Sequence, residues 1–240
     1  MSQRRQPFLA ARRRALAAFA TLPALPIATA MPTTAPIAAH DARAIAAPQP
    51  VLDLDRAAMD LFDAAEAGRW GDARDALSRA RVATAALRSV EGAYTDAGGA
   101  LHRYIEARNG LGADLLEAGT AVSVQDRRWL VSVASHVAAR AGELSLPFVG
   151  HGDAVAPLIE ALLFLALRMR RALVWQDNIG LHAAMDDFAR LWTSLRGRLG
   201  ARVAADRLHA LDAALGRLTN HASAADVRRL YDSVIALRGG

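Results

Sequence analysis

The side chains most able to bind a metal in this sequence are histidines, because the 240-residue chain contains no cysteine. Two of them lie four residues before an acid, His102 before Glu106 and His182 before Asp186, so each pair shares one face of a helix. That spacing is also usual for ordinary charge pairs on helix surfaces, and the chain has no H-E-x-x-H or E-x-x-H motif. A divalent metal site in a helical bundle needs ligands from several helices. The candidate metal ligands are His136, His151 and His182.

A single carboxylate, Glu160, interrupts the most apolar stretch of the chain, residues 154–167. Burying an unpaired charge is costly, so we expect Glu160 to meet an arginine, a hydrogen-bond donor or water. One interpretation is a buried glutamate–arginine pair that fixes the register of two helices. The other is a candidate cofactor-binding acid in a ligand pocket, with His151 or His182 nearby.

Three arginines follow at the end of the same apolar segment: Arg168, Arg170 and Arg171. Cations at the C-terminal end of a helix oppose its dipole, so we expect these side chains to be solvated and to stabilise the helix end. An anion-binding site is the alternative interpretation.

The sequence lacks the motifs of common catalytic sites. Ser132, Ser135 and His136 fall on one expected helix, but no G-x-S-x-G elbow, glycine-rich phosphate loop or paired-carboxylate signature occurs. The absence of cysteine excludes disulfides, covalently attached c-type haem, cysteine-ligated iron–sulfur clusters and a cysteine nucleophile. An enzyme on a helical scaffold is therefore only the second alternative.

The net charge of +5 comes entirely from the N-terminal region. Residues 1–50 hold six arginines and one acid, whereas the remainder holds 23 arginines and 23 acids and has no net charge. A neutral body gives no general electrostatic reason to bind nucleic acid or an anionic membrane. We therefore expect no nucleic-acid partner, and contact with a membrane only through an uncleaved leader.

Residues 1–31 have the pattern of a secretory signal peptide. A basic run ends at Arg14, an apolar stretch follows over residues 15–31, and small residues suited to cleavage surround Ala30. The apolar stretch is shorter than the ~20 residues that span a membrane and contains two prolines. The sequence is compatible with the general export route and, because it contains arginine pairs, with the twin-arginine route. The alternative interpretations of residues 1–31 are an organellar transit peptide and an uncleaved tail. Residues 32–50, rich in proline and alanine, are predicted to be a linker.

Residues 51–240 are predicted to form an all-α, antiparallel bundle of about six to eight helices, because helix formers dominate and strand-like runs are rare. The most apolar helix, 153–175, is expected at the centre of the bundle. Ser123 and Ser223, each followed three residues later by an aspartate, are predicted to cap helices. The expected helices are 53–67, 72–90, 100–109, 113–118, one from 123 to the loop at 146, 153–175, 181–199, 201–218 and 224–237.

A tight helical hairpin is predicted near Gly68. The segment Gly68-Arg69-Trp70-Gly71-Asp72-Ala73, continuing to Leu77 and Ala80, resembles the turn and second helix of a tetratricopeptide hairpin. The resemblance covers residues 53–82, lacks the aromatic and glycine of the first helix, and has no second copy at a 34-residue period. The resemblance implies a tight pair of helices at this point of the chain.

These observations favour an exported, non-enzymatic accessory or protein-interaction protein of the cell envelope, in the bacterial periplasm. The first alternative is a periplasmic bundle that binds a divalent metal or another cofactor. A protein partner follows from the leading interpretation, whereas the ligand and the oligomeric state have no signature in the sequence.

Overall fold

Helices account for all regular secondary structure in the parts of the chain that the structure describes. The structure is a computed structural model, and it describes residues 46–148, 155–200, 203–220 and 222–238. Within these ranges there are nine α-helices and no strand, so the all-α prediction is confirmed and the total is above the expected six to eight. The predicted residue ranges differ as well: 100–109 and 113–118 form one helix, and the helix Glu91–Asp96 has no predicted counterpart. The predicted leader at 1–31, the linker up to residue 45 and the candidate ligand His151 lie outside the described residues.

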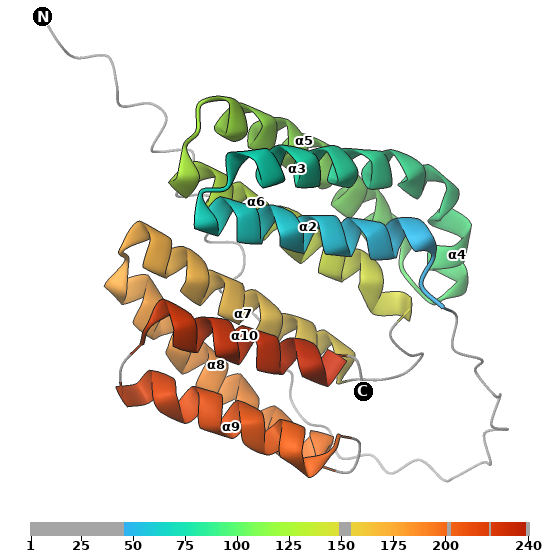
Figure 1. The fold of residues 1–240 in the computed structure, drawn as a ribbon. Helices are drawn as coiled ribbons and strands as arrows, with labels where there is room; N and C mark the ends of the chain where they lie inside the picture. The colour runs from blue at the N-terminus through green and yellow to red at the C-terminus, as the bar shows by residue number, and fades with distance from the viewer. Residues whose placement is uncertain (1–45, 149–154, 201–202, 221, 239–240) are drawn as a thin grey trace, which may run out of the picture. The chain divides into compact units, whose positions relative to one another are not determined.

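The helices follow one another with short connections (Figure 1). Short 3₁₀ turns occupy residues 87–89 and 146–148. The α-helices are α2 (Gln49–Ala67), α3 (Trp70–Ala86), α4 (Glu91–Asp96), α5 (Leu101–Ser123), α6 (Arg127–Ser145), α7 (Ala156–Trp175), α8 (Asn178–Leu199), α9 (Ala205–Asn220) and α10 (Ala224–Arg238).

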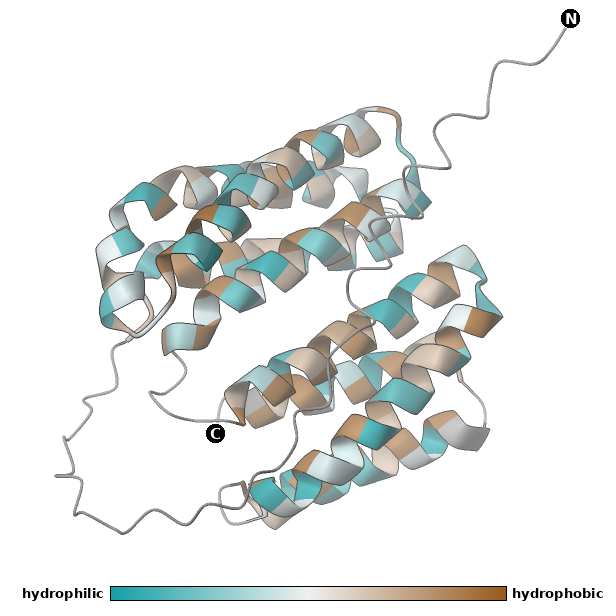
Figure 2. Ribbon diagram, turned by 180° about the vertical axis from the view of Figure 1, so that it is seen from behind, coloured by the Kyte–Doolittle hydropathy of each residue, from teal (hydrophilic) through white to brown (hydrophobic). Residues whose placement is uncertain are grey.

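The contacts between helices divide them into two groups. Helix α2 packs on α3 and α6, and α5 packs on both α3 and α6. In the second group α7 packs on α8 and α10, and α10 packs on α9. Hydrophobic and hydrophilic residues alternate along each helix (Figure 2), as expected for elements that bury one stripe.

Helix α7 joins the two groups, which agrees with its predicted central position. It packs on α6 and makes fewer contacts with α2, in addition to its neighbours α8 and α10. Ten of its residues are buried, among them Leu162, Leu163 and Met169. The helix begins at Ala156, with a proline in its first turn, where the missing N–H of proline has no helical partner to lose.

The hairpin predicted at Gly68 is present between α2 and α3. Gly68 ends α2 in the left-handed conformation, with φ 70°, which glycine adopts without the steric cost that other residues carry. Ala73 and Ala80 are fully buried on α3, and Trp70 packs against the core from a half-buried position. The structure therefore shows the tight αα-hairpin, and the resemblance to tetratricopeptide repeats remains a prediction.

One of the two predicted helix caps is wrong. Ser223 accepts a hydrogen bond from the backbone N–H of Asp226 at 3.1 Å and donates one to the Asp226 carboxylate, as predicted at the start of α10. At α6, however, the cap is Asp126, whose carboxylate accepts from the N–H of Trp129 at 2.9 Å. Ser123 instead belongs to the last turn of α5 and donates to the carbonyl of Thr120.

Glycine does not break α5, contrary to the expectation of two short helices at 100–109 and 113–118. The helix runs without interruption from Leu101 to Ser123 through Gly110, Gly112 and Gly119. Gly110 and Gly119 are each covered by an arginine side chain, Arg140 and Arg81 respectively. Tertiary contacts therefore hold a helix that the intrinsic preferences of glycine disfavour.

Replacement of Gly112 by alanine is expected to stabilise the protein. A Cβ at this position would meet no atom within 4 Å, and alanine loses less conformational entropy than glycine when a helix forms. Gly112→Ala should raise the free energy of unfolding by about 0.5–1 kcal/mol in urea denaturation followed by circular dichroism. Gly110→Ala is the control, because its Cβ would collide with Arg140 and disturb the 2.7 Å ion pair of Arg140 with Asp114. Equal stabilisation by both variants would contradict this explanation.

Candidate functional site

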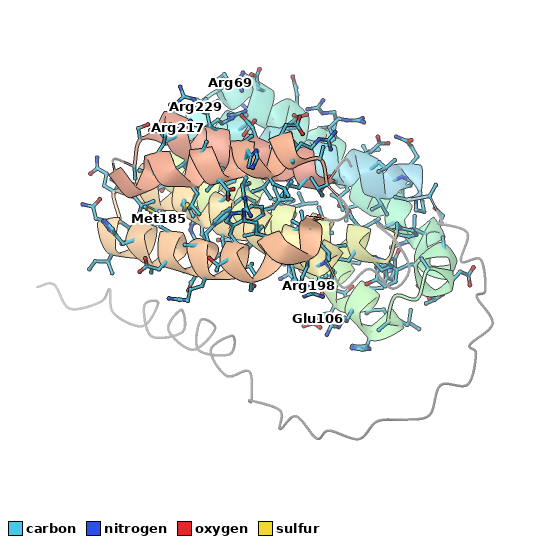
Figure 3. All side chains as sticks on the ribbon, turned by 90° about the horizontal axis from the view of Figure 1, so that it is seen from below. Arg69, Glu106, Met185, Arg198, Arg217 and Arg229 are labelled. Atoms are coloured by element: carbon cyan, nitrogen blue, oxygen red, sulfur yellow. The ribbon has the colours of Figure 1, made fainter. Side chains whose placement is uncertain are left out.

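His136 and His182, the two predicted metal ligands within the described residues, do not form a metal site together. His136 is exposed on α6, and His182 is exposed on α8, with its Nδ1 2.6 Å from the carbonyl oxygen of Asn178. Within the described ranges, no group of three or more histidine, aspartate or glutamate side chains could hold a metal ion. The histidine–acid pair on α5 is on the surface as well. His102 and Glu106 are both exposed, and Figure 3 shows Glu106 at the outer edge of the structure.

His136 is the histidine with a perturbed proton affinity. His136 reaches solvent, but the protein around it removes part of the hydration of the imidazole, and this desolvation lowers the pKa of His136; Asp114 opposes the shift by favouring the charged imidazolium. The lowered pKa keeps the imidazole neutral at pH values where an ordinary histidine begins to gain a proton. A neutral imidazole is the form that binds metals, but His136 belongs to no group of three or more possible metal ligands among the described residues.

The serine–histidine arrangement on α6 is not set up for nucleophilic catalysis. Ser135 is buried, and its hydroxyl donates to the carbonyl oxygen of Ser132 at 2.6 Å. A nucleophilic serine instead needs a hydrogen bond to a general base. The enzyme alternative thus receives no support from these residues.

Glu160 lies at the contact between α7 and α6, but it is only half-buried. Its Oε2 is 2.7 Å from the point that a Cβ at Gly142 of α6 would occupy, so the carboxylate lies directly over that buried glycine. Full burial was expected from the apolar sequence around it. The difference arises because Glu160 is at the edge of the α6–α7 contact, whereas Leu162 and Leu163 face the interior.

The fully buried charge on α7 is Arg170, which contradicts the expectation of a solvated helix end. Its side chain is 1% exposed, whereas Arg168 and Arg171 are half-buried. The Nη2 of Arg170 donates to Asp63 Oδ1 at 2.6 Å, and Nε donates to Glu66 Oε1 at 3.1 Å. Both acids belong to α2, so one guanidinium connects the two groups of helices.

Aromatic rings enclose the same guanidinium. The centre of the Arg170 guanidinium lies 4.6 Å from the ring centroid of Phe62 on α2 and 5.0 Å from that of Tyr231 on α10. Arg228 of α10 binds the second oxygen of Asp63 at 2.8 Å. We call Arg170, Asp63, Glu66 and Arg228 the arginine cluster. It fixes the positions of α2, α7 and α10 relative to one another.

The charge balance of the arginine cluster favours a permanently charged Arg170. Burial lowers the pKa of Arg170, but the hydrogen bonds and negative charges of Glu66 and Asp63 outweigh burial and leave the pKa raised. Its Nη1 is buried without a hydrogen-bond partner among the described residues. Because the guanidinium is enclosed, it is not accessible to a ligand in solution, and its role is structural.

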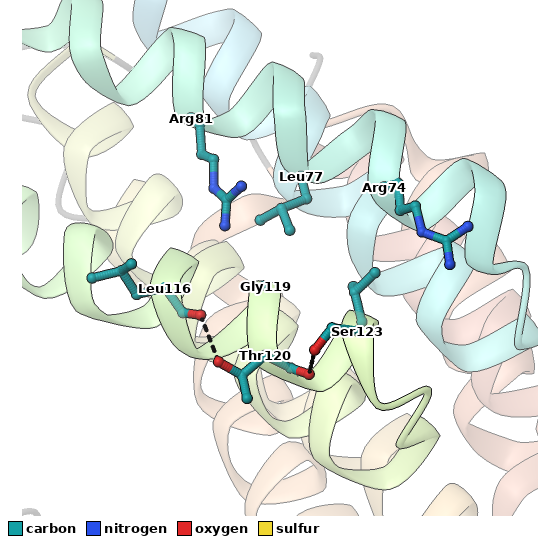
Figure 4. A pocket seen from close by; sticks show the side chains of 8 residues that line it. Arg74, Leu77, Arg81, Leu116, Gly119, Thr120 and Ser123 are labelled. Atoms are coloured by element: carbon teal, nitrogen blue, oxygen red, sulfur yellow. Dashed lines mark hydrogen bonds between the residues drawn. The ribbon is translucent and has the colours of Figure 1, made fainter.

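A shallow groove of about 440 Å³ lies between α3 and α5 (Figure 4). Leu77 and Arg81 extend from α3 toward α5, and Leu116, Gly119 and Ser123 form the opposite side. The Nη2 of Arg81 donates to the carbonyl oxygen of Leu115 at 3.1 Å. The groove is open to solvent and combines apolar side chains with arginines, so it is suited to a surface ligand more than to an enclosed small molecule.

Helix α5 carries exposed apolar residues beside this groove. Leu116 is 73% exposed, and Leu101 and Ile105 are exposed as well. Positions 101, 105, 112, 116, 119 and 123 follow three-, four- and seven-residue steps and therefore lie on one face of the helix. We call this row the α5 face. Three of its six residues, Leu101, Ile105 and Leu116, are exposed apolar side chains, whereas Gly119 is covered by Arg81. Exposed apolar side chains that share a helix face are a candidate protein-binding surface.

A second groove, of about 560 Å³, lies between α2 and α3 and is lined mainly by acids. Two of these acids already have arginine partners: Asp60 pairs with Arg79 at 2.8 Å and Asp72 with Arg69 at 3.0 Å. Asp63 belongs to the arginine cluster. The acids of this groove are thus largely engaged in ion pairs of the fold.

Comparison of the chain with protein-family models, curated proteins and solved structures finds no match. None of the described helices is both long enough and apolar enough to cross a bilayer. The α3–α5 groove with the α5 face is therefore the candidate functional site because it combines exposed apolar side chains with arginines. The sequence analysis did not predict this site. The signal that could have found it is the apolar row on α5, which a continuous helix over 101–123 would have revealed.

Proposed function

We propose that the chain is an exported, non-enzymatic helical-bundle protein that works in the bacterial periplasm and binds a partner protein there. The single observation that carries the proposal is the α5 face beside the α3–α5 groove. Leu116 is 73% exposed on it, in a helix that packs on α3 and α6 through its other side. Water contact with its exposed leucines and isoleucine is unfavourable, and a partner that covers these side chains would gain the hydrophobic contribution.

The size of the native complex tests this proposal. The chain is extracted gently from its native cells, and its complexes are separated by size and detected with an antibody. Leu116→Asp should remove the larger complex, because a carboxylate cannot enter a dry apolar interface without cost. Ile179→Asp is the matched control, since Ile179 is an apolar residue 86% exposed on α8. A complex that survives Leu116→Asp, or that Ile179→Asp disrupts equally, would contradict the proposal.

Export predicts a shortened N-terminus. The basic and then apolar leader, with small residues after it, predicts cleavage between Ala30 and Ala47. The measurement is N-terminal sequencing of the protein purified from fractionated native cells. We expect the new terminus within that window and the protein in the periplasmic fraction. An intact Met1 on cytoplasmic protein would refute export and leave the binding surface to be explained inside the cell.

A further inference from the structure

A row of three arginines follows α3: Arg74 and Arg81 line the α3–α5 groove, and Arg88 lies beyond the residues that line it. Arg74, Arg81 and Arg88 are exposed and seven residues apart, along α3 and the 3₁₀ turn that follows it. None of the three forms an ion pair within the described part of the chain, whereas Arg79 of the same helix pairs with Asp60 at 2.8 Å. The arginines therefore offer positive charge along one side of an apolar surface.

The spacing of this row matches a helical ligand. Seven residues of an α-helix span about 10.5 Å, so arginines at this interval meet acids that recur every seven residues on a parallel or antiparallel helix. An extended strand covers the same distance in about three residues, which would put successive acids on opposite faces. The described part of the chain also has no sheet edge to which a strand could add.

The apolar side of the groove suits the same ligand. Leu116 stands exposed on α5, and Leu77 is buried at the floor on the α3 side. Gly112 precedes Leu116 by one helical turn, and a Cβ added there would meet nothing within 4 Å, so another helix can approach α5 closely at this point. An amphipathic helix buries its apolar row in such a groove and keeps its charges at the rim.

We infer that the α3–α5 groove binds an amphipathic helix of the partner, with its apolar row on the α5 face and its acids, at seven-residue intervals, beside Arg74, Arg81 and Arg88. This inference rests on the proposed function and names the chemistry of the partner. A protein helix is preferred to an anionic membrane because residues 51–240 have no net charge, so the arginine row is a local feature and not part of a basic face.

A pair of synthetic peptides tests the inference with the full chain. Each peptide has three heptads with leucine at the first and fourth positions, and the flanking positions carry glutamate in one and lysine in the other. Fluorescence anisotropy should show the glutamate peptide binding roughly tenfold more tightly than the lysine peptide. The variant Arg74→Glu/Arg81→Glu should reverse that order. Arg198→Glu, an exposed arginine of α8 without an ion pair among the described residues, should leave it unchanged.

Several results would overturn the inference. Equal binding of the two peptides, or no change in the double variant, would show that the arginine row does not select acids. Sedimentation of the full chain with phosphatidylglycerol vesicles, lost in the double variant while neither peptide binds, would assign the row to a membrane. A dimer of the chain that Leu116→Asp dissociates would assign the groove to a second copy. If the peptides fail but Leu116→Asp still removes the native complex, only the inference is wrong; if that complex persists, the proposed function fails as well.

Discussion

Arg170→Met is expected to lower the free energy of unfolding by about 3 kcal/mol, because it leaves two carboxylates of α2 without their buried cation. Asp63 and Glu66 keep part of their contact with water, and Arg228 still binds Asp63 at 2.8 Å, so we expect the lower end of the range for broken buried pairs. Urea denaturation followed by circular dichroism at 222 nm measures the change.

Two further variants separate the ion pair from simple loss of packing. Arg168→Met, on the same helix, removes a half-exposed arginine that lies 3.4 Å from Asp187, and it should cost less than about 1 kcal/mol. Combining Arg170→Met with Asp63→Asn and Glu66→Gln should recover part of the loss, because the stranded charges disappear with their partner. Equal effects of Arg170→Met and Arg168→Met would contradict the structural role of the arginine cluster.

Leu163→Asp is expected to abolish cooperative folding. Leu163 is 6% exposed on α7, the helix of the second group that also packs on α6 and α2 of the first, and a carboxylate there would be buried without a partner. The cost of such a substitution, several kcal/mol, is comparable with the total stability of a domain. Thermal melts and size-exclusion chromatography of the purified protein measure the effect.

Phe164→Asp provides the matched control for this prediction. Phe164 is the next residue along α7, but it is 38% exposed and points away from the packed side. We expect this variant to fold and to melt cooperatively. A soluble Leu163→Asp variant with a melting temperature near that of the wild type would show that α7 is not the central helix of the structure.

Much of the helical organisation follows from local signals in the sequence. The apolar run at 154–167 identifies α7 as a buried helix, because a helix that is apolar on most sides belongs in a protein core or a membrane. Gly68 marks the end of α2 through its left-handed conformation, and Ser223 caps α10 with its own side chain. Each of these signals acts within a few residues of its position, and so it can be recognised from the chain alone.

The errors arise where distant parts of the chain decide the outcome. The glycines of α5 predict a break by their intrinsic preference, but packing on α3 and α6 keeps the helix continuous. Arg170 is enclosed by acids that precede it by more than 100 residues in the chain. Arg168, Arg170 and Arg171 are indistinguishable by sequence, and only the position of α2 determines which of them is buried. Glu160 was expected to be buried because its sequence neighbours are apolar, but it is only half-buried, where α7 meets α6.

The candidate site was missed for a related reason. A search for chemistry directs attention to histidines, serines and buried acids, whereas the α3–α5 groove consists of leucines, glycines and exposed arginines. The groove forms only where α3 and α5 lie side by side, and the sequence of either helix alone does not indicate it. The heptad spacing of Arg74, Arg81 and Arg88 is visible in the sequence, but its meaning depends on the apolar row of α5 beside it.

Site-specific photo-crosslinking in native cells tests the binding surface most directly. A photoreactive phenylalanine analogue is placed at Leu116 and, in a separate strain, at Ile179, two apolar positions that are 73% and 86% exposed. We expect one crosslinked partner from position 116 and none from position 179, with the crosslink weakened by Arg74→Glu/Arg81→Glu in the same chain. Equal crosslinking at the two positions, or none at position 116 in cells that keep the native complex, would contradict a partner-binding role of the α5 face.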